Sequence, residues 1–374
     1  MRYFNRDALE VKPLAERKNK LSVANNVRPN SPSAPLSEQA LCDIQSIVSR
    51  LLSARQAGAS RMLVFGAHSI KNGLADLLIR LMEKGDVTHL ATNGAGIIHD
   101  WEFAFQGQTG ENVEHYTAEG QFGIWEETGK FLNLALIIGA YRGLGYGQSV
   151  GTMVQEGGLT IPGEGELFET IRRTADEGAD AASADRAAAA ADLLETKRHF
   201  RLDEGFIPIP HRFPEHSVAA AAVRLGVPFT CHPMIGHDII YTHPMNKPAA
   251  IGRTAERDFL CFADSVSRLE HGIYLSVGSA VMSPMIFEKS LSMSRNLARQ
   301  RGESITDFDI HVVDLAASTW DWTTQGEPPQ DNPAYYLRFC KTFSRMGGKM
   351  TYTSADNRSW LLEILRRLDQ TRSS

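Results

Sequence analysis

The sequence contains few cysteines, and none of them is spaced for a disulfide framework or a metal site. Four occur in 374 residues, and no CxxC pair is formed by Cys42, Cys231, Cys261 and Cys340. Disulfide-rich domains and zinc fingers need paired or closely spaced cysteines. Their absence favours a reduced, cytoplasmic compartment and gives no indication of a structural metal.

A basic stripe and a long apolar run are also missing. The formal net charge is −5, whereas sequence-independent nucleic-acid binding needs clustered lysine and arginine. Residues 1–20 are too polar for a signal peptide, and no apolar segment reaches the length of a membrane span. We therefore expect a cytoplasmic globular protein that contacts neither nucleic acid nor membrane.

Residues 61–100 carry the most informative pattern, which predicts a strand, a helix and a second strand. Met62–Phe65 is a continuous apolar run, as expected of a parallel strand that is buried on both faces. Apolar residues recur at helical spacing from 74 to 82, and a second strand is predicted at Val87–Ala91. The loop Asn93–Gly96 follows at its carboxyl end, where doubly wound folds bind nucleotides.

The same alternation continues along the chain. Helices are predicted from about Ser37 to Gln56, within 167–196, and after Pro214. Further strands are predicted at Leu134–Ile138, Val227–Thr230, Gly272–Val277, Asp309–Val313 and Lys349–Tyr352. We predict an extended N-terminal arm at 1–37 and a single large α/β domain at 38–374, with a doubly wound, mostly parallel, Rossmann-like sheet.

Four stretches together resemble deoxyhypusine synthase, an NAD-dependent family that transfers the aminobutyl group of spermidine to a protein lysine. The likeness spans roughly residues 60 to 365. It is carried by residues 65–100 with ATNGAGIIHD, 214–248 with HPMIGHDIIYTHP, 272–287 with GIYLSVGSAVMSPMIF and 333–352 with PAYYLRFCKTFSRMGGKMTY. The resemblance implies a deoxyhypusine synthase-like fold that binds NAD, a polyamine substrate, and a homo-oligomer, either a dimer or a tetramer.

The resemblance also implies roles for individual residues. Lys341 falls on the imine-forming lysine, Phe339 on the aromatic residue two positions before it, and Asp238 on a carboxylate that holds an ammonium of the polyamine. The cofactor site that we predict consists of His68, Ser69, Asn93, Gly94, Ala95, Gly278 and Ser354.

This chain departs from the family pattern at several positions. Ile98 and His99 replace a pair of glutamates, and Pro233 replaces a cofactor-binding aspartate. Ser283-Pro284-Met285 replaces a Lys-His-His sequence, and Tyr335 replaces a site glutamate. We therefore expect a divergent member whose acceptor is a free amine rather than a protein, as in the synthesis of homospermidine from spermidine and putrescine.

The residues themselves are compatible with this chemistry. A lysine is a nucleophile only when uncharged, which burial or a cationic neighbour favours, and Lys341 follows an apolar segment with Arg338 close by. His99 could transfer protons and Asp100 beside it could bind the substrate, although a polar residue here could equally satisfy the end of a helix. Trp322 lies in a long polar loop, where an exposed tryptophan is expected to line a ligand pocket or a subunit contact, with packing in the core as the alternative.

Other interpretations stay open. Lys341 could be a surface lysine on a helix, and Asp238 could cap a helix or turn. A metal-dependent hydrolase is the first alternative function, because imidazoles and a carboxylate bind zinc or manganese, although the spacing of His232, His237, Asp238 and His243 matches no standard motif. The second alternative is a non-catalytic dinucleotide-binding protein of the same fold.

Overall fold

The computed structural model describes residues 1–26, 34–174 and 180–373. Parts of the predicted arm and of the predicted helices within 167–196 fall at 27–33 and 175–179, outside the described residues. Contacts divide the chain into two compact units. Unit 1 consists of Met1–Ala24, Ile97–Arg224 and Pro233–Asp258, and unit 2 of Asn25–Gly96, Leu225–His232 and Phe259–Ser374.

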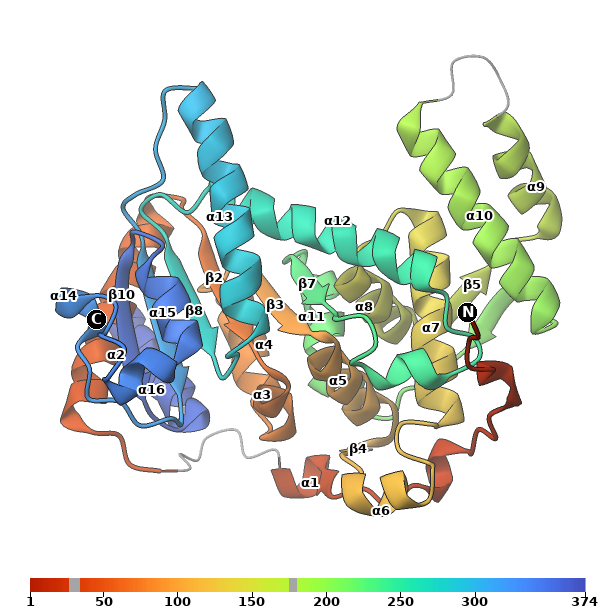
Figure 1. Ribbon diagram of the computed structural model, residues 1–374, viewed down its shortest axis with the longest axis horizontal. Coiled ribbons are helices and arrows are strands. Elements are labelled where there is room, and N and C mark those ends of the chain that lie inside the picture. The colour runs from red at the N-terminus through yellow and green to blue at the C-terminus, as the bar shows by residue number, and fades with distance from the viewer. Residues whose placement is uncertain (27–33, 175–179, 374) are drawn as a thin grey trace. The chain divides into compact units, whose positions relative to one another are not determined.

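Unit 2 is built on a six-stranded sheet in which all neighbouring strands are parallel. The order β10-β9-β8-β2-β3-β7 (Figure 1) is formed by β2 (Arg61–Phe65), β3 (His89–Asn93), β7 (Phe229–His232), β8 (Ile273–Val277), β9 (Asp309–Asp314) and β10 (Lys349–Ser354). Along the chain, β3 and β7 are added on one side of β2, and β8, β9 and β10 are then added on its other side. This is the strand order of dinucleotide-binding folds. The predicted doubly wound α/β fold is confirmed, and each of these strands was predicted to within two residues.

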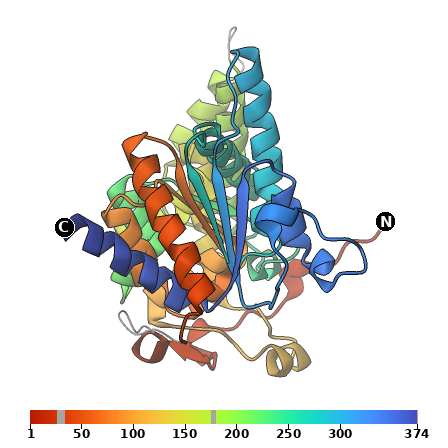
Figure 2. The same ribbon diagram turned by 90° about the vertical axis from the view of Figure 1, so that its left-hand side faces the viewer.

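Helices cover both faces of this sheet. α2 (Glu38–Gln56) and α16 (Asn357–Ser373) lie on one side of the strands, and α13 (Met282–Gln300) and α15 (Arg338–Ser344) lie on the other (Figure 2). Successive side chains of a strand point to opposite faces. Accordingly, Thr353 of β10 donates to Asp43 of α2 at 2.7 Å, while Met350 belongs to the core on the α13 side. The remaining elements of unit 2 are α3 (Ala67–Lys71), α4 (Ala75–Glu83), α14 (Trp322–Gln325) and the 3-10 helix η5 (Pro333–Tyr336).

Unit 1 is mainly helical and contains two small antiparallel sheets among its described residues. The sheets pair β1 (Leu21–Ser22) with β4 (Gln108–Thr109), and β5 (Gly158–Ile161) with β6 (Gly205–Pro208). Its helices are α6 (Val113–Ala118), α7 (Glu126–Arg142), α8 (Tyr146–Glu156), α9 (Glu164–Arg173), α10 (Ala181–His199), and the short 3-10 helices η1 (Arg6–Ala8), η2 (Leu14–Glu16), η3 (Pro214–His216) and η4 (Ile239–Thr242). Four helices contain residues of both units: α1 (Val23–Asn26), α5 (Gly94–Gln106), α11 (Val218–Leu225) and α12 (Pro248–Ser267).

The strand predicted at Leu134–Ile138 is wrong, because these residues form the middle of α7. Every residue of this segment is buried, since α7 is packed against α8, α10 and η4. A helix that is enclosed on all sides has apolar residues all round and loses the helical period that marks a surface helix. A short apolar run then looks the same as a buried strand.

The N-terminal arm is attached to unit 1 through two buried side chains. Leu14 is 1% exposed, and Arg17 forms a bidentate ion pair with Glu102 at 2.7 and 2.8 Å. The bidentate geometry fixes the two side chains relative to each other, and removing one of them would leave an uncompensated buried charge. In the described part of the chain, no helix has both the length and the apolar character needed to cross a bilayer.

Candidate functional site

All seven predicted cofactor residues lie just after, or at, the carboxyl ends of strands of unit 2. His68 and Ser69 belong to α3 after β2, and Asn93 ends β3. The others are Gly94 and Ala95 at the start of α5, Gly278 directly after β8, and Ser354 at the end of β10. Since parallel strands end at the same edge of a sheet, the sequence placed these residues on the edge where doubly wound folds bind nucleotides.

The loops after β2 and β8 meet where the strand order reverses. The N–H of Gly66 donates to the carbonyl of Val277 at 3.1 Å, and a Cβ on Gly66 would collide with the carbonyl oxygen of Gly278. Gly278 has a φ of +56°, and a Cβ there would lie 2.6 Å from Nδ2 of Asn357. Both positions therefore require glycine, and the backbone is left bare at the point where a pyrophosphate approaches such folds.

Two buried polar atoms in the helices that follow β2 and β10 have no hydrogen-bond partner. Ser69 is 1% exposed and its Oγ is unbonded, while Asn357, at the start of α16, is 8% exposed and its Oδ1 is unbonded. Buried polar atoms are normally paired, so these two are available to a ligand. Together with the bare backbone and the N-terminus of α5, they fit the hydroxyls and phosphates of a dinucleotide.

Other features of this edge differ from the usual dinucleotide-binding pattern. The turn after β2 lacks the GxGxxG spacing, and β3 ends in Asn93, where an acidic residue usually binds the ribose. Oδ1 of Asn93 accepts the N–H of Gly96 at 2.9 Å and so caps α5. At its carboxyl end, β3 therefore carries an amide side chain, where NAD-binding folds usually have a carboxylate.

Lys341, on α15, has an aromatic ring and a carboxylate beside its amine. Nζ lies 3.7 Å from the centroid of the Tyr335 ring and 4.0 Å from Oε1 of Glu327, and the side chain is 18% exposed. Both neighbours stabilise an ammonium. Tyr335, which contributes this ring, stands where the deoxyhypusine synthase pattern has a site glutamate.

The residues around Lys341 pack against the core of unit 2. Phe339 is half-buried, with its ring centroid 6.1 Å from that of Tyr352. Trp322 is only 3% exposed, in contrast to the exposed position that its polar surroundings suggested, because its loop folds back on β10 and Thr323 donates to the carbonyl of Met350 at 2.7 Å. Burial raises the pKa of the Cys340 thiol far above its usual value, which leaves little reactive thiolate.

His99 is held by a chain of hydrogen bonds in unit 1. Its Nδ1 lies 2.7 Å from Oγ1 of Thr109, which donates to Glu102. Burial alone would raise the pKa of Glu102, but the charge and hydrogen bonds of Arg17 outweigh it and place the pKa below the ordinary value. A carboxylate that stays ionised therefore orients the hydroxyl that in turn orients His99, which is an arrangement suited to a proton-transfer imidazole.

Asp100 and Asp238, both predicted to bind substrate, have different surroundings in unit 1. Asp100 caps α11, because its carboxylate accepts from Ser217 Oγ at 2.7 Å and from the N–H groups of Val218 and Ala219 at 2.7 and 3.2 Å. Asp238 precedes η4 without a side-chain capping bond, and its buried Oδ2 has no partner. Burial raises the pKa of each to about 6. Asp238 is the one of the two whose carboxylate is open to a cationic ligand.

Two of the histidines considered as metal ligands are bound to other groups. In unit 1, Nε2 of His243 lies 3.2 Å from Glu126 and its Nδ1 accepts the N–H of Met245 at 3.1 Å. In unit 2, Nε2 of His232 lies 2.9 Å from Oγ1 of Thr230. Within residues 1–26, 34–174 and 180–373, no group of three or more His, Cys, Asp or Glu side chains is arranged to hold a metal ion. The hydrolase alternative thus gains no support from these contacts.

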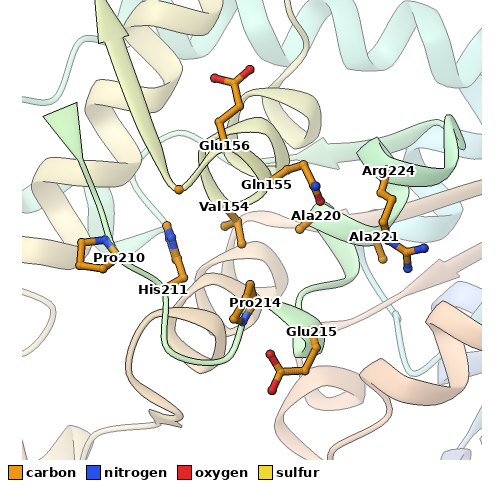
Figure 3. A pocket seen from close by; sticks show the side chains of 11 residues that line it. Val154, Gln155, Glu156, Pro210, His211, Pro214, Glu215, Ala220, Ala221 and Arg224 are labelled. Atoms are coloured by element: carbon orange, nitrogen blue, oxygen red, sulfur yellow. The ribbon is translucent and has the colours of Figure 1, made fainter. Parts of the chain in front are cut away.

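Unit 1 also contains a cavity of about 520 Å³ that the sequence did not indicate. Figure 3 shows His211 and Arg224 on opposite sides, with Glu156 and Glu215 at the other two margins. Burial lowers the pKa of His211 to about 4, so the imidazole is neutral at physiological pH. Because the lining residues come from separate segments of the chain, no spacing in the sequence connects them.

The predicted site residues are divided between the two units. Unit 2 holds the seven predicted cofactor residues with Lys341, Phe339 and Trp322, and unit 1 holds His99, Asp100 and Asp238. Sequence reasoning missed Gly66 and Asn357. A glycine directly after the first strand was a usable signal for Gly66, whereas the burial of Asn357 has no counterpart in the sequence.

No family model matches this chain, and no curated protein is similar to it. Among solved structures, the chain is similar to AgrE in a ternary complex with ornithine and NAD+, with 14% identity and a TM-score of 0.44 over 91% of this chain and 35% of AgrE. It is also similar to a candidate LOR/SDH protein from Methanococcus maripaludis S2, with 11% identity and a TM-score of 0.41 over 97% of this chain and 76% of that one. A candidate deoxyhypusine synthase from Entamoeba histolytica shows 11% identity and a TM-score of 0.38 over 88% of each chain. The chain spans about a third of the length of AgrE. The function proposed below therefore rests on the strand order and side chains of this chain.

Proposed function

We propose that this chain is an NAD-dependent enzyme that transfers an aminobutyl group from a polyamine to a free amine. The observation that carries the proposal is the reversal of strand order between β2 and β8, with bare backbone at Gly66 and Gly278. The unbonded Oγ of Ser69 and Oδ1 of Asn357 would hold the hydroxyls or phosphates of the cofactor. When bound, NAD+ accepts a hydride from the carbon beside the secondary amine of the polyamine.

Lys341 is the residue proposed to carry the aminobutyl group. Its uncharged amine adds to the oxidised carbon, and the departing diamine leaves with the electron pair of its C–N bond and a proton, so that an imine remains on Lys341. Nζ of Lys341 lies between the carboxylate of Glu327 and the ring of Tyr335. To react, the amine of Lys341 must be uncharged and must move away from Glu327 and Tyr335 toward the oxidised carbon.

Two groups of unit 1 complete the proposal. His99, oriented by Thr109 and Glu102, would exchange protons with the amines. Asp238 would bind an ammonium of the polyamine through its unbonded Oδ2. We also propose a cytoplasmic homo-oligomer, either a dimer or a tetramer, as the resemblance implies.

Trapping the imine tests the transfer step. The protein is incubated with NAD and spermidine, reduced with borohydride, and digested for mass spectrometry. We expect an aminobutyl adduct on Lys341, no adduct in Lys341→Arg, and a normal adduct in Lys289→Arg, which changes an exposed lysine of α13. Wild-type protein that binds NAD but gives no adduct would contradict the transfer chemistry and favour a non-catalytic dinucleotide-binding protein.

A further inference from the structure

Unit 2 contains a second cavity, of about 510 Å³, beside the edge strand β10. Its lining comes from the first half of α2, from residues 318–323, from His311 of β9, and from Lys349, Thr351 and Tyr352 of β10. His311 and Thr351 are paired in register near the middle of their strands, not at the carboxyl ends where the predicted cofactor residues lie. The cavity is therefore separate from the predicted cofactor positions.

Two deeply buried side chains of this cavity have polar atoms without hydrogen bonds. His311 is 2% exposed, and neither of its ring nitrogens has a hydrogen-bond partner; its nearest charged neighbour is Asp309, 3.7 Å from Nε2. Trp322 is 3% exposed, and its Nε1 is also unbonded. An indole N–H can only donate, whereas a neutral imidazole offers one donor and one acceptor. Leaving such groups unpaired costs free energy that a ligand would recover.

Several other polar groups at the cavity already have hydrogen-bond partners. Asp43 accepts from Gln39 at 2.9 Å and from Thr353 at 2.7 Å. Asp321 caps α14 by accepting the N–H groups of Thr323 and Thr324, and Nε1 of Trp320 donates to Gly326 at 2.9 Å. These hydrogen bonds occupy part of the acceptor capacity of the two carboxylates, and Lys349 adds a positive charge to the lining, so a cationic ligand is not favoured.

We propose that this cavity binds a flat, uncharged heterocycle, namely the base of a nucleoside. A nucleobase edge presents donors and acceptors side by side, which matches the N–H of Trp322 and the two ring nitrogens of His311. Four ring systems line the cavity, those of His311, Trp320, Trp322 and Tyr352, and aromatic walls stack on bases of any sequence. The cavity shares no residue with the predicted cofactor site, so this inference does not depend on the proposed function.

Titration of the full chain with adenosine, guanosine, cytidine and uridine tests the inference, with ribose as a ligand that lacks a base. Binding is measured by calorimetry and by tryptophan fluorescence, and the variants below distinguish this cavity from a site at the carboxyl edge. We expect saturable 1:1 binding of at least one nucleoside and none of ribose. Trp322→Phe, which removes the N–H and keeps most of the ring, should weaken binding by roughly tenfold.

Two further variants complete the test. Trp360→Phe makes the same chemical change at a fully buried tryptophan of α16 whose Nε1 is also unbonded but which does not line the cavity, and it should leave the affinity unchanged. Thr319→Tyr fills the cavity from its exposed rim without touching a buried residue and should abolish binding. The inference is overturned if no nucleoside binds saturably, or if neither Trp322→Phe nor Thr319→Tyr weakens binding more than Trp360→Phe does.

Discussion

At the scale of single residues, Gly66 and Gly278 control the backbone of the candidate cofactor site. The two glycines touch where the strand order reverses, and neither has room for a Cβ. The resemblance to deoxyhypusine synthase implied that Gly278 lies near a cofactor, but it gave no account of the contact with Gly66. Contacts between residues more than 200 positions apart depend on strand order, which a local pattern does not contain.

Gly66→Ala is expected to destabilise the protein and to weaken NAD binding. The added methyl group would meet the carbonyl oxygen of Gly278, and overpacking of this kind costs about 1–3 kcal/mol. Chemical denaturation measures the change in the free energy of unfolding. Gly252→Ala is the matched control: nothing lies within 4 Å of its Cβ position in α12, and alanine there should be neutral or stabilising. Equal stabilities of the two variants would contradict the tight contact.

Other residues show where a sequence signal has two meanings. Asp100 follows the pattern of an acidic residue near a nucleotide loop, yet its carboxylate caps α11. Asn93 lies at the expected strand end, and its side chain caps α5. Asp238 retains an unbonded oxygen, but nothing in HPMIGHDIIYTHP distinguishes it from a capping residue. Residue type and position in the sequence therefore predicted the neighbourhood of these side chains better than their partners.

At the scale of elements, β3 and β7 are joined by a buried hydrogen-bonded chain. Oγ1 of Thr230 lies 2.9 Å from Nε2 of both His89 and His232, and Nδ1 of His89 lies 2.8 Å from Oγ of Ser265. Burial lowers the pKa of each imidazole from 6.5 to about 3. Both histidines are therefore neutral in the folded protein over the physiological range.

This chain of hydrogen bonds predicts a loss of stability in acid. Between pH 6.5 and 3 the unfolded chain binds protons that the folded His89 and His232 do not, so the free energy of unfolding falls as the pH falls, by up to about 1.4 kcal/mol per pH unit for each imidazole. Asp100 and Asp238, with pKa values raised to about 6, act in the opposite direction. The contribution of one imidazole must therefore be obtained as a difference between proteins.

The comparison uses His89→Gln and the wild type, unfolded with urea from pH 7.5 to 4.5. The variant should lose less stability on acidification, because one titrating group is gone while the two aspartates remain. His115→Gln, at an exposed position of α6, should keep the wild-type dependence. Parallel curves for His89→Gln and wild type would show that His89 is not held neutral by the fold.

The secondary structure of unit 2 was largely predictable because most of its strands are short, almost continuously buried segments bounded by turn residues, with β10 the exception. The strand predicted at Leu134–Ile138 was wrong because α7 is buried on all sides. For these strands and for α7 alike, an apolar run in the sequence correctly predicted a buried segment. Only the length of the buried segment and its packing partners separate a strand from an enclosed helix.

At the scale of the whole molecule, the chain interrupts its parallel sheet to build a second compact unit. Most of unit 1 lies between β3 and β7, and a further segment follows β7. Sequence patterns predict the order of elements but not which elements pack together, so the grouping into two units had no signal in the sequence. The proposed site residues include members of both units.

The proposed oligomer is tested by sedimentation equilibrium of the full chain. A dimer or tetramer is expected at micromolar concentration, in keeping with closed symmetric assemblies. A single species with the mass of one chain across the concentration range would contradict it.

Calorimetric titration of NAD into the wild type and two serine variants tests the cofactor site most directly. We expect 1:1 binding to the wild type and several-fold weaker binding to Ser69→Ala, because Oγ of Ser69 is a buried, unbonded atom beside the carboxyl end of β2. Ser290→Ala makes the same change at a buried, unbonded hydroxyl within α13 and should bind NAD as the wild type does. No binding of NAD to the wild type, or equal affinities of the two variants, would contradict a dinucleotide site at this edge of the sheet.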